Sequence, residues 1–434
     1  MTLLIISPDY ASHLLPLATL ATAWRQAGER VVVATGPATA DIVESFGFER
    51  VNLQLGKGSN PGVIRAEEQP TGEDDALRGF FDATRRGMVE TLSFQAEARL
   101  SDLMWEPVRV AREVQAVVAE VRPDAIIVDH LAFSARLALV AAGVPFADVV
   151  LGHPSALPVG DEVYGFPPAW PAAFDPSPEE LRMLRDLCDR VSESFTAEWN
   201  AALAELAPEA KLSASAFSEH GELLLLNYPA ELSPPARTAL LPPHRFLGSS
   251  VRDEARDAEV DAWLAASDDP FVYVSFGSFL SVRADVLARV CAALQQVGIR
   301  GAIALGSADR GELGELPAGW LVREFLPQVS LLERAAAAVT HGGNNSVTES
   351  MTAGVPLVVL PFSTDQFAGA AALENAGFGI ALAPNTATVA ELADAVRTAL
   401  DLPARSALVS LSAQLRQEAE SRPSFLAVTS VSTS

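Results

Sequence analysis

The nine residues from His341 to Glu349, which read His-Gly-Gly-Asn-Asn-Ser-Val-Thr-Glu, combine glycines and polar side chains at a spacing suited to binding an anion. An apolar run at 335–339 precedes them and predicts a buried strand, and the residues up to Gly354 are compatible with a helix. Glycines let a backbone approach a ligand closely, and a helix N-terminus presents unpaired N–H groups with positive dipole character. The segment therefore predicts a strand, a glycine turn and a polar helix start that together hold phosphate.

Several side chains of this segment have an expected role in such a cradle. His341, Asn345 and Ser346 add hydrogen-bond donors, and the small Gly343 permits close approach. Glu349 lies one helical turn further on, where its carboxylate can accept hydrogen bonds from sugar hydroxyls. A plain glycine-rich strand-to-helix turn with a polar cap has the same composition, so the segment alone leaves both interpretations open.

The sequences that flank the cradle favour the first interpretation. In chain order they are Phe325-Leu326-Pro327-Gln328, Leu331-Leu332, Gly354-Val355-Pro356, Pro361 and Asp365-Gln366. In this order the block resembles the nucleotide-sugar signature of the UDP-glycosyltransferase-like family, which has the GT-B fold. Three positions depart from that signature: Phe325 and Asn344 stand where Trp is common, and Gly369 replaces an Asn.

The pattern of apolar runs predicts two α/β units. Runs at 3–7 and 30–35 flank a helix-compatible stretch at 14–27, which is the spacing of parallel strands joined by a right-handed crossover. A second alternating series starts at 272–276, after a passage rich in Pro and charge. The mixed, polar region 55–105 predicts loops and helices over the edge of the first sheet, and 428–434 predicts a frayed tail.

The family resemblance implies the same architecture in more detail. We expect two Rossmann-like, doubly wound domains that face each other across a cleft. Residues 1–240 would form the acceptor-binding domain, 241–257 the linker, and 258–434 the domain that binds the nucleotide sugar. In such sheets ligands bind outside the carboxyl ends of the strands.

Two residues of the first half are the candidates for proton transfer. His13 follows the first predicted strand at the start of a helix, where the helix dipole disfavours imidazolium and favours a neutral base. Asp129 ends the apolar run 125–128 and can fix the tautomer of that histidine. The resemblance implies a catalytic His and its Asp at these positions, and helix capping is the alternative role for each. We expect His130 to point away from the cleft and His153 to line the acceptor pocket.

For the nucleotide sugar, the resemblance implies a set of contacts in the second half. Phe325 would stack on the base, and Gln328 would contact the nucleoside. The diphosphate would be held by Ser278, His341, Asn345 and Ser346 at the Gly343 turn. Glu349 would bind the ribose, while Asp365 and Gln366 would bind hydroxyls of the transferred sugar.

Composition excludes several classes of function. With 31 basic and 55 acidic residues, the 434-residue chain carries a formal charge of −24, which argues against nucleic acid or an anionic membrane as partner. Two cysteines, Cys188 and Cys291, are too few for a disulfide framework or a cysteine-rich zinc site. With no signal peptide and no membrane-spanning run, we expect a cytoplasmic protein. The sequence lacks Gly-x-Gly-x-x-Gly, Walker, Gly-x-Ser-x-Gly and Asp-x-Asp motifs, so we expect no cofactor and no metal.

These observations and the resemblance together predict a bacterial, metal-independent, inverting glycosyltransferase of natural-product or antibiotic biosynthesis. It would transfer a hexose, with glucose expected, from a UDP-sugar to a hydroxyl of an apolar small molecule such as a polyketide, macrolide, flavonoid or sterol. The alternatives are a dTDP-deoxysugar transferase, a nucleotide-sugar epimerase on the same architecture, and a non-catalytic binding protein. The presence of both His13 and Asp129 counts against the last. The oligomeric state is not predicted.

Overall fold

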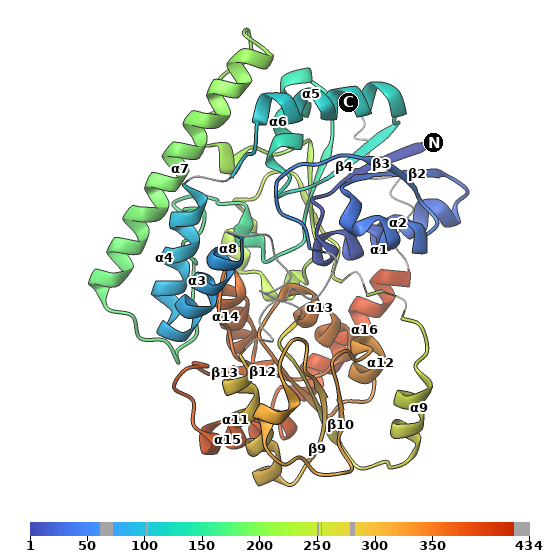
Figure 1. Cartoon of the computed structure of the whole chain (residues 1–434), viewed down its shortest axis with the longest axis vertical. Helices are drawn as coiled ribbons and strands as arrows, with labels where there is room; N and C mark the ends of the chain where they lie inside the picture. Colours follow the sequence, from blue (N-terminus) through green and yellow to red (C-terminus); the bar gives the residue numbers. More distant parts are fainter. Residues whose placement is uncertain (61–72, 101–102, 250, 253, 278–282, 421–434) are drawn as a thin grey trace.

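The chain folds into two parallel β-sheets, each flanked by helices, as Figure 1 shows for the computed structural model. The structure describes residues 1–60, 73–100, 103–249, 251–252, 254–277 and 283–420. Ser278 and the tail predicted at 428–434 lie outside these residues.

The first sheet has seven strands in the order β3-β2-β1-β4-β5-β6-β7, and the pairs between them are parallel. In that order the strands are β3 Glu49–Asn52, β2 Arg30–Thr35, β1 Thr2–Ile6, β4 Ala125–Asp129, β5 Ala147–Val150, β6 Leu223–Leu226 and β7 His244–Phe246. The helices of this half are α1 Ala11–Gln26, α2 Ala40–Ser45, α3 Glu73–Arg86, α4 Met88–Arg99, α5 Pro107–Val121, α6 Phe133–Ala142, α7 Pro178–Leu206 and α8 Pro235–Thr238.

The second sheet has six strands in the order β10-β9-β8-β11-β12-β13, again with parallel pairs. In that order the strands are β10 Leu321–Arg323, β9 Arg300–Ala304, β8 Phe271–Ser275, β11 Ala337–Thr340, β12 Leu357–Val359 and β13 Gly379–Ala381. Its helices are α9 Ala258–Ala265, α11 Ala284–Val297, α12 Gln328–Leu332, α13 Asn344–Ala353, α14 Gln366–Ala376, α15 Val389–Leu400 and α16 Arg405–Glu420. The predicted pair of doubly wound domains is therefore confirmed.

The central strands of both sheets are buried on their two faces, which explains why these strands read as continuous apolar runs. In β1, Leu3 and Ile5 join a core that contains Leu17 and Trp24 of α1. The alternate residues of the same strand, Leu4 and Ile6, join the opposite core with α5. Successive side chains of a strand point to opposite faces, so one apolar strand supplies two cores.

The boundary between the halves differs from the prediction. Strand β7 pairs with β6 and forms the edge of the first sheet, although its residues 244–246 fall in the predicted linker 241–257. The first sheet thus extends past residue 240. From the other side, α16 reaches back to the first half, where Gln414 bonds to Glu231.

The prediction for 55–105 was wrong about what its helices cover. Helix α3 does not lie over the edge of the first sheet, because Phe80 and Phe81 belong to the same core cluster as Val274 and Phe276 of the second half. The carbonyl of Thr84, near the end of α3, accepts hydrogen bonds from second-half side chains. In Figure 1, α3 and α4 lie beside α7 and close to α14. A segment that belongs to the first half by sequence is therefore docked onto the second.

Candidate active site

The two predicted proton-transfer residues meet at the point where the first sheet reverses its strand order. His13 lies in the first turn of α1, after β1, and Asp129 is the last residue of the adjacent strand β4. The His13 Nδ1 atom lies 2.7 Å from Asp129 Oδ2. The other carboxylate oxygen accepts the backbone N–H of Leu131 at 2.9 Å. Asp129 is thus fixed by its own loop and fixes the imidazole in turn, which leaves Nε2 for a substrate.

The pKa of His13 differs from the expectation. The helix N-terminus was expected to keep the imidazole neutral. Burial does lower the pKa of the imidazole, but the Asp129 carboxylate, with a contribution from Asp365, outweighs burial and raises the pKa above its usual value. The base is therefore stronger than the helix argument predicted, because a carboxylate in direct contact acts more strongly than a helix dipole.

His130, the neighbour of Asp129, was predicted to point away from the cleft; its side chain is buried, although the residue forms part of the cavity lining. Its side chain is 1% exposed, and its Nδ1 lies 3.5 Å from Asp148 Oδ1. Arg136 of α6 contacts the same carboxylate oxygen through Nε at 3.0 Å. Burial, reinforced by the positive charge of Arg136, lowers the pKa of His130. The ion pair between Arg136 and Asp148 joins α6 to β5. The His130 ring faces the same Asp148 carboxylate.

A cavity of about 960 Å³ lies between the halves. Residues of both candidate sites line it: the His13–Asp129 pair and the predicted phosphate cradle. The first half contributes His13, Asp129 and an apolar wall that includes Leu77, Phe80, Leu92, Tyr164 and Phe166. The second half contributes polar groups and one exposed aromatic: Arg252, Phe325, Gln328, His341, Gly343, Asn344, Asn345, Ser346, Asp365 and Gln366. An apolar wall facing a polar wall suits one apolar and one charged substrate.

The predicted phosphate cradle has the expected backbone. Gly343 is the residue before α13, and Gly342 has φ +84°, a conformation that side chains disfavour. The ring of His341 packs tightly here: a Cβ on Gly277 would lie 2.8 Å from it, and a Cβ on Gly343 only 2.4 Å. Both glycines are therefore needed to seat the imidazole. Burial lowers the pKa of His341 to about 4, so the ring is neutral near pH 7.

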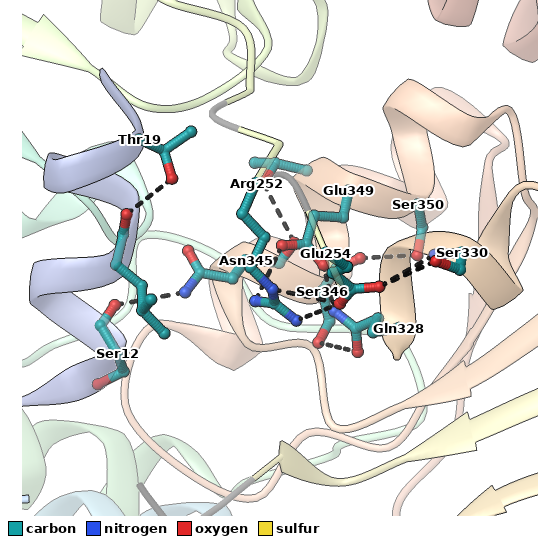
Figure 2. A network of polar contacts seen from close by, with 12 residues as sticks. Ser12, Thr19, Arg252, Glu254, Gln328, Ser330, Asn345, Ser346, Glu349 and Ser350 are labelled. Atoms are coloured by element: carbon teal, nitrogen blue, oxygen red, sulfur yellow. Dashed lines mark hydrogen bonds and ion pairs between the residues drawn. The ribbon is translucent and has the colours of Figure 1, made fainter. Parts of the chain in front are cut away.

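Glu349 is more enclosed than the sequence suggested. It is 4% exposed, and its two oxygens accept hydrogen bonds from Arg252 Nη1 at 3.3 Å and from Gln328 Nε2. Figure 2 shows Arg252 and Gln328 converging on this carboxylate. Gln328 also accepts from the Ser346 hydroxyl at 3.3 Å. These contacts form one network of four side chains, and three of them line the cavity: Arg252, Gln328 and Ser346.

The two asparagines of the cradle connect the halves. Asn344 Nδ2 donates to the carbonyls of Leu151 and Asn227 at 2.6 and 2.9 Å. Asn345 Nδ2 lies 3.3 Å from the carbonyl of Ser12, next to His13, as Figure 2 shows. The predicted role of Asn345 on the diphosphate is thus accompanied by a structural one, because its amide joins α13 to the start of α1.

Asp365 and Gln366, the predicted sugar ligands, already have protein partners. Asp365 Oδ2 accepts the backbone N–H of His153 at 2.6 Å, across the cavity. Gln366 is 7% exposed, and its amide oxygen accepts the N–H groups of Phe362 and Ser363 at 3.0 and 3.1 Å. Gln366 therefore shapes the turn that presents Asp365 to the cavity.

Phe325 and His153 end in opposite environments. Phe325 is 57% exposed at the cavity, the placement expected for a ring that stacks on a ligand. The His153 ring, predicted for the acceptor pocket, is instead buried: its Nδ1 bonds to the Ser155 hydroxyl at 2.9 Å, and burial with the nearby Arg237 lowers its pKa to about 3. The neighbours Ser155 and Ala156 line the cavity in its place.

Sequence reasoning missed Arg252 and the bridging role of Asn344. Arg252 stood in the predicted linker, and no local pattern marks a linker arginine as part of a site. Among the described residues, no group of three or more His, Cys, Asp and Glu side chains is placed to hold a metal ion. Likewise, no helix in the described part of the chain is long and apolar enough to cross a membrane.

Comparison with known proteins points to one family. A sequence model described as "UDP-glucoronosyl and UDP-glucosyl transferase" matches residues 181–429, more than half of the chain. The NDP-glycosyltransferase YjiC of Bacillus subtilis is 30% identical over 154 residues, which are 35% of this chain and 38% of that protein. The anthocyanidin 3-O-glucosyltransferase of Hordeum vulgare is 36% identical over 174 residues, 37% of each chain. These matches span well under half the length of either relative.

Solved structures extend the likeness to the whole fold. The glycotransferase of kitacinnamycin superposes with a TM-score of 0.67 at 22% identity, covering 96% of this chain and 95% of that one. The spinosyn rhamnosyltransferase SpnG, solved with thymidine diphosphate, superposes with a TM-score of 0.66 at 18% identity and 99% coverage of both chains. The superpositions establish that this chain shares the GT-B fold with these proteins. At identities this low they show the fold alone.

Proposed function

Because the chain belongs to the UDP-glucoronosyl and UDP-glucosyl transferase family, we propose that it is an inverting glycosyltransferase that moves a hexose from a UDP-sugar to a hydroxyl of an apolar small molecule. The observation that carries the proposal is the His13–Asp129 pair, with 2.7 Å between Nδ1 and Oδ2, on the cavity that also contains the predicted phosphate cradle. A displacement reaction of this kind needs a base for the acceptor hydroxyl and a site that stabilises the departing diphosphate. This cavity contains a candidate for each.

The reaction we propose is a single displacement. Nε2 of His13 takes the proton of the acceptor hydroxyl while its oxygen forms a bond to the anomeric carbon. The bond from that carbon to the diphosphate oxygen breaks, and the nucleoside diphosphate leaves with the electron pair. Asp129 stabilises the imidazolium that forms. One displacement inverts the configuration at the anomeric carbon.

The diphosphate would be held by neutral donors. The N-terminus of α13 presents backbone N–H groups and positive dipole character. His341 lines the same cavity as a neutral ring, and Ser346 adds a hydroxyl. These groups stabilise developing negative charge without a metal, so we expect EDTA to leave turnover unchanged. A strict requirement for Mg²⁺ or Mn²⁺ in the chemical step would contradict this account of the diphosphate site.

The acceptor would occupy the apolar side of the cavity. Leu77, Phe80 and Leu92 from α3 and α4 form part of this wall, and Phe166 adds an aromatic face. A flat or extended aglycone such as a polyketide, macrolide, flavonoid or sterol matches such a wall in size and polarity. The relative from Hordeum vulgare, named for an anthocyanidin acceptor, supports this class.

A second candidate differs only in the donor. A dTDP-deoxysugar transferase is favoured by the likeness to SpnG, which was solved with thymidine diphosphate. We prefer a UDP-sugar because Glu349 contacts Gln328, a predicted nucleoside ligand on the cavity wall, and a carboxylate oxygen that already accepts one hydrogen bond can accept another from a ribose hydroxyl.

The experiment that tests the proposal is a screen of nucleotide hexoses against hydroxyl-bearing aglycones. Products would be detected by mass, and the anomeric configuration would be read by NMR. We expect transfer from UDP-hexoses with inversion. Retention of configuration, or interconversion of the nucleotide sugar without an acceptor as in an epimerase, would contradict the proposal.

A further inference from the structure

Arg252 is the one cavity-lining side chain that comes from the segment between β7 and α9, among the residues that the structure describes. Its Nη1 donates to Glu349 Oε1 at 3.3 Å, and its side chain remains 28% exposed. Arg252 therefore lines the cavity and contacts the carboxylate that was predicted to bind ribose, while Glu349 itself is not among the lining residues; Figure 2 shows the contact.

A second carboxylate fixes Arg252 in this position. Glu254 Oε1 accepts from Nη2 at 3.0 Å and from Nε at 3.3 Å. The other oxygen of Glu254 accepts the backbone N–H of Ser330, in the first turn of α12, at 3.1 Å. Arg252 is thus tied to the domain that carries Glu349, although it belongs to the connecting segment.

This arrangement gives each oxygen of Glu349 one protein donor before any nucleotide binds. Gln328 Nε2 donates to Oε2, and Arg252 donates to Oε1. Burial raises the pKa of Glu349, and the charge of Arg252 opposes that effect. Leaving a buried carboxylate without a hydrogen-bond partner costs free energy. The cost is smaller when a cation stays beside the carboxylate and compensates its charge.

The consequence concerns the sugar of the donor nucleotide. If Glu349 depended on the two ribose hydroxyls, a 2′-deoxynucleotide would leave the carboxylate short of one hydrogen bond. Loss of one hydrogen bond to a charged group corresponds to roughly a ten- to hundredfold loss of affinity. With Arg252 already paired to Oε1, the same loss leaves the charge compensated, so the penalty is smaller.

We propose that Arg252 is a specificity-determining residue that, by pairing with Glu349, reduces discrimination against 2′-deoxyribonucleoside diphosphates. The inference rests on the proposed donor site, with Glu349 beside the ribose.

The test compares UDP with 2′-deoxy-UDP, which differ only in the hydroxyl in question. Calorimetric titration at about pH 8, where carboxylates are ionised, gives the ratio of the two dissociation constants. We expect a ratio below about tenfold for the wild type and a ratio about tenfold larger for Arg252→Met, which keeps the aliphatic stem and removes the charge. An unchanged or smaller ratio for Arg252→Met would overturn the proposal, even if both affinities fall, because the ratio cancels any contact with the diphosphate.

Four further variants, one of them a control, test whether the charge of Arg252 acts through Glu349. Arg252→Lys keeps a positive charge and should keep the wild-type ratio, while a shift equal to that of Arg252→Met would overturn a charge-based account. The double variant Arg252→Met/Glu349→Gln should have the ratio of Glu349→Gln alone, because Arg252 acts through that carboxylate. Arg256→Gln, at an exposed arginine of the same segment, is the matched control.

The outcomes for the wild type separate this inference from the proposed function. If the wild type binds neither UDP nor 2′-deoxy-UDP, the donor assignment itself is wrong. If it binds them with a ratio that does not depend on Arg252, the donor site stands and the role of Arg252 is wrong. Thermal melting of each variant shows whether it is folded.

Discussion

The two halves of the molecule place their candidate sites at the same point of the topology but build them differently. In each sheet the site lies where the strand order reverses, between β1 and β4 in the first half and between β8 and β11 in the second. In the second half, the cradle is one contiguous segment, His341 to Glu349. In the first half, His13 and Asp129 are 116 residues apart, and the adjacency of two strands joins them.

Because the two sites are built differently, substitutions can alter one without altering the other. The cradle depends on local backbone geometry, so it carries its own sequence signature. The candidate catalytic pair, His13 and Asp129, depends on strand order and on one hydrogen bond. The apolar wall of the cavity, where we propose that the acceptor binds, depends on α3 and α4, of which α3 packs into a core of the opposite half. We therefore expect substitutions in the first half to change turnover, and substitutions in the second half to change donor affinity.

The largest expected effect comes from His13→Ala. Loss of a general base costs on the order of 10²–10⁴-fold in rate, and the predicted nucleotide contacts lie in the other half. Turnover should fall by that factor while UDP affinity, measured by titration, stays within about twofold. His220→Ala, at an exposed histidine of the same half, is the matched control. A large loss of UDP affinity in His13→Ala would break the comparison between the halves.

Asp129→Asn should cost somewhat less, on the order of 10²–10³-fold in kcat, because the histidine remains but loses the carboxylate that fixes its tautomer. The amide can still accept the backbone N–H of Leu131, so the loop should keep its conformation. A near-UV circular dichroism spectrum checks the fold. An activity close to that of the wild type would mean that Asp129 only caps its loop.

Phe325→Ala tests the second half. Stacking of an aromatic side chain on a base is worth roughly a ten- to hundredfold in affinity, and 57% of Phe325 is exposed for such a contact. We expect KM for the donor to rise by about that factor with kcat little changed. Phe325→Trp should retain the wild-type KM. A fall in kcat without a change in KM would contradict the stacking role.

The smallest effect is a displacement of the pH profile. The pKa of His13 is raised above 6.5, chiefly because Asp129 outweighs burial, and the base must be neutral to accept a proton. The value of kcat/KM should therefore rise with pH through an inflection above 6.5. In Asp129→Asn the inflection should move to lower pH, because burial then acts without the carboxylate. An inflection that stays in place would show that another group titrates.

Most of the fold could be predicted from the sequence because its signals are local. The buried strands appear as apolar runs, and α13 ends at Gly354 as its pattern predicted. The cradle could also be located, since its glycines and polar residues are contiguous. His13 and Asp129 could be selected as candidates because one follows and the other ends an apolar strand, at the edge where a parallel sheet binds its ligands.

The parts that could not be predicted depend on contacts between distant segments. Nothing in α3 indicates that Phe80 and Phe81 pack against the second half, since an amphipathic face does not name its partner. The raised pKa of His13 reflects a residue 116 positions away, whereas the helix position alone suggested the opposite direction. The pairing of Arg252 with Glu349 joins a connecting segment to a helix in the same way.

The most direct test of the central claim, that His13 and Asp129 act as one catalytic unit, is a double-mutant cycle on the single-turnover rate of sugar transfer. The wild type, His13→Ala, Asp129→Asn and the double variant would be compared at saturating donor and acceptor. Residues that act as a unit give strongly non-additive losses. We predict that the double variant is within about threefold of His13→Ala. Losses that multiply, or a His13→Ala rate above about a tenth of the wild-type rate, would contradict the claim.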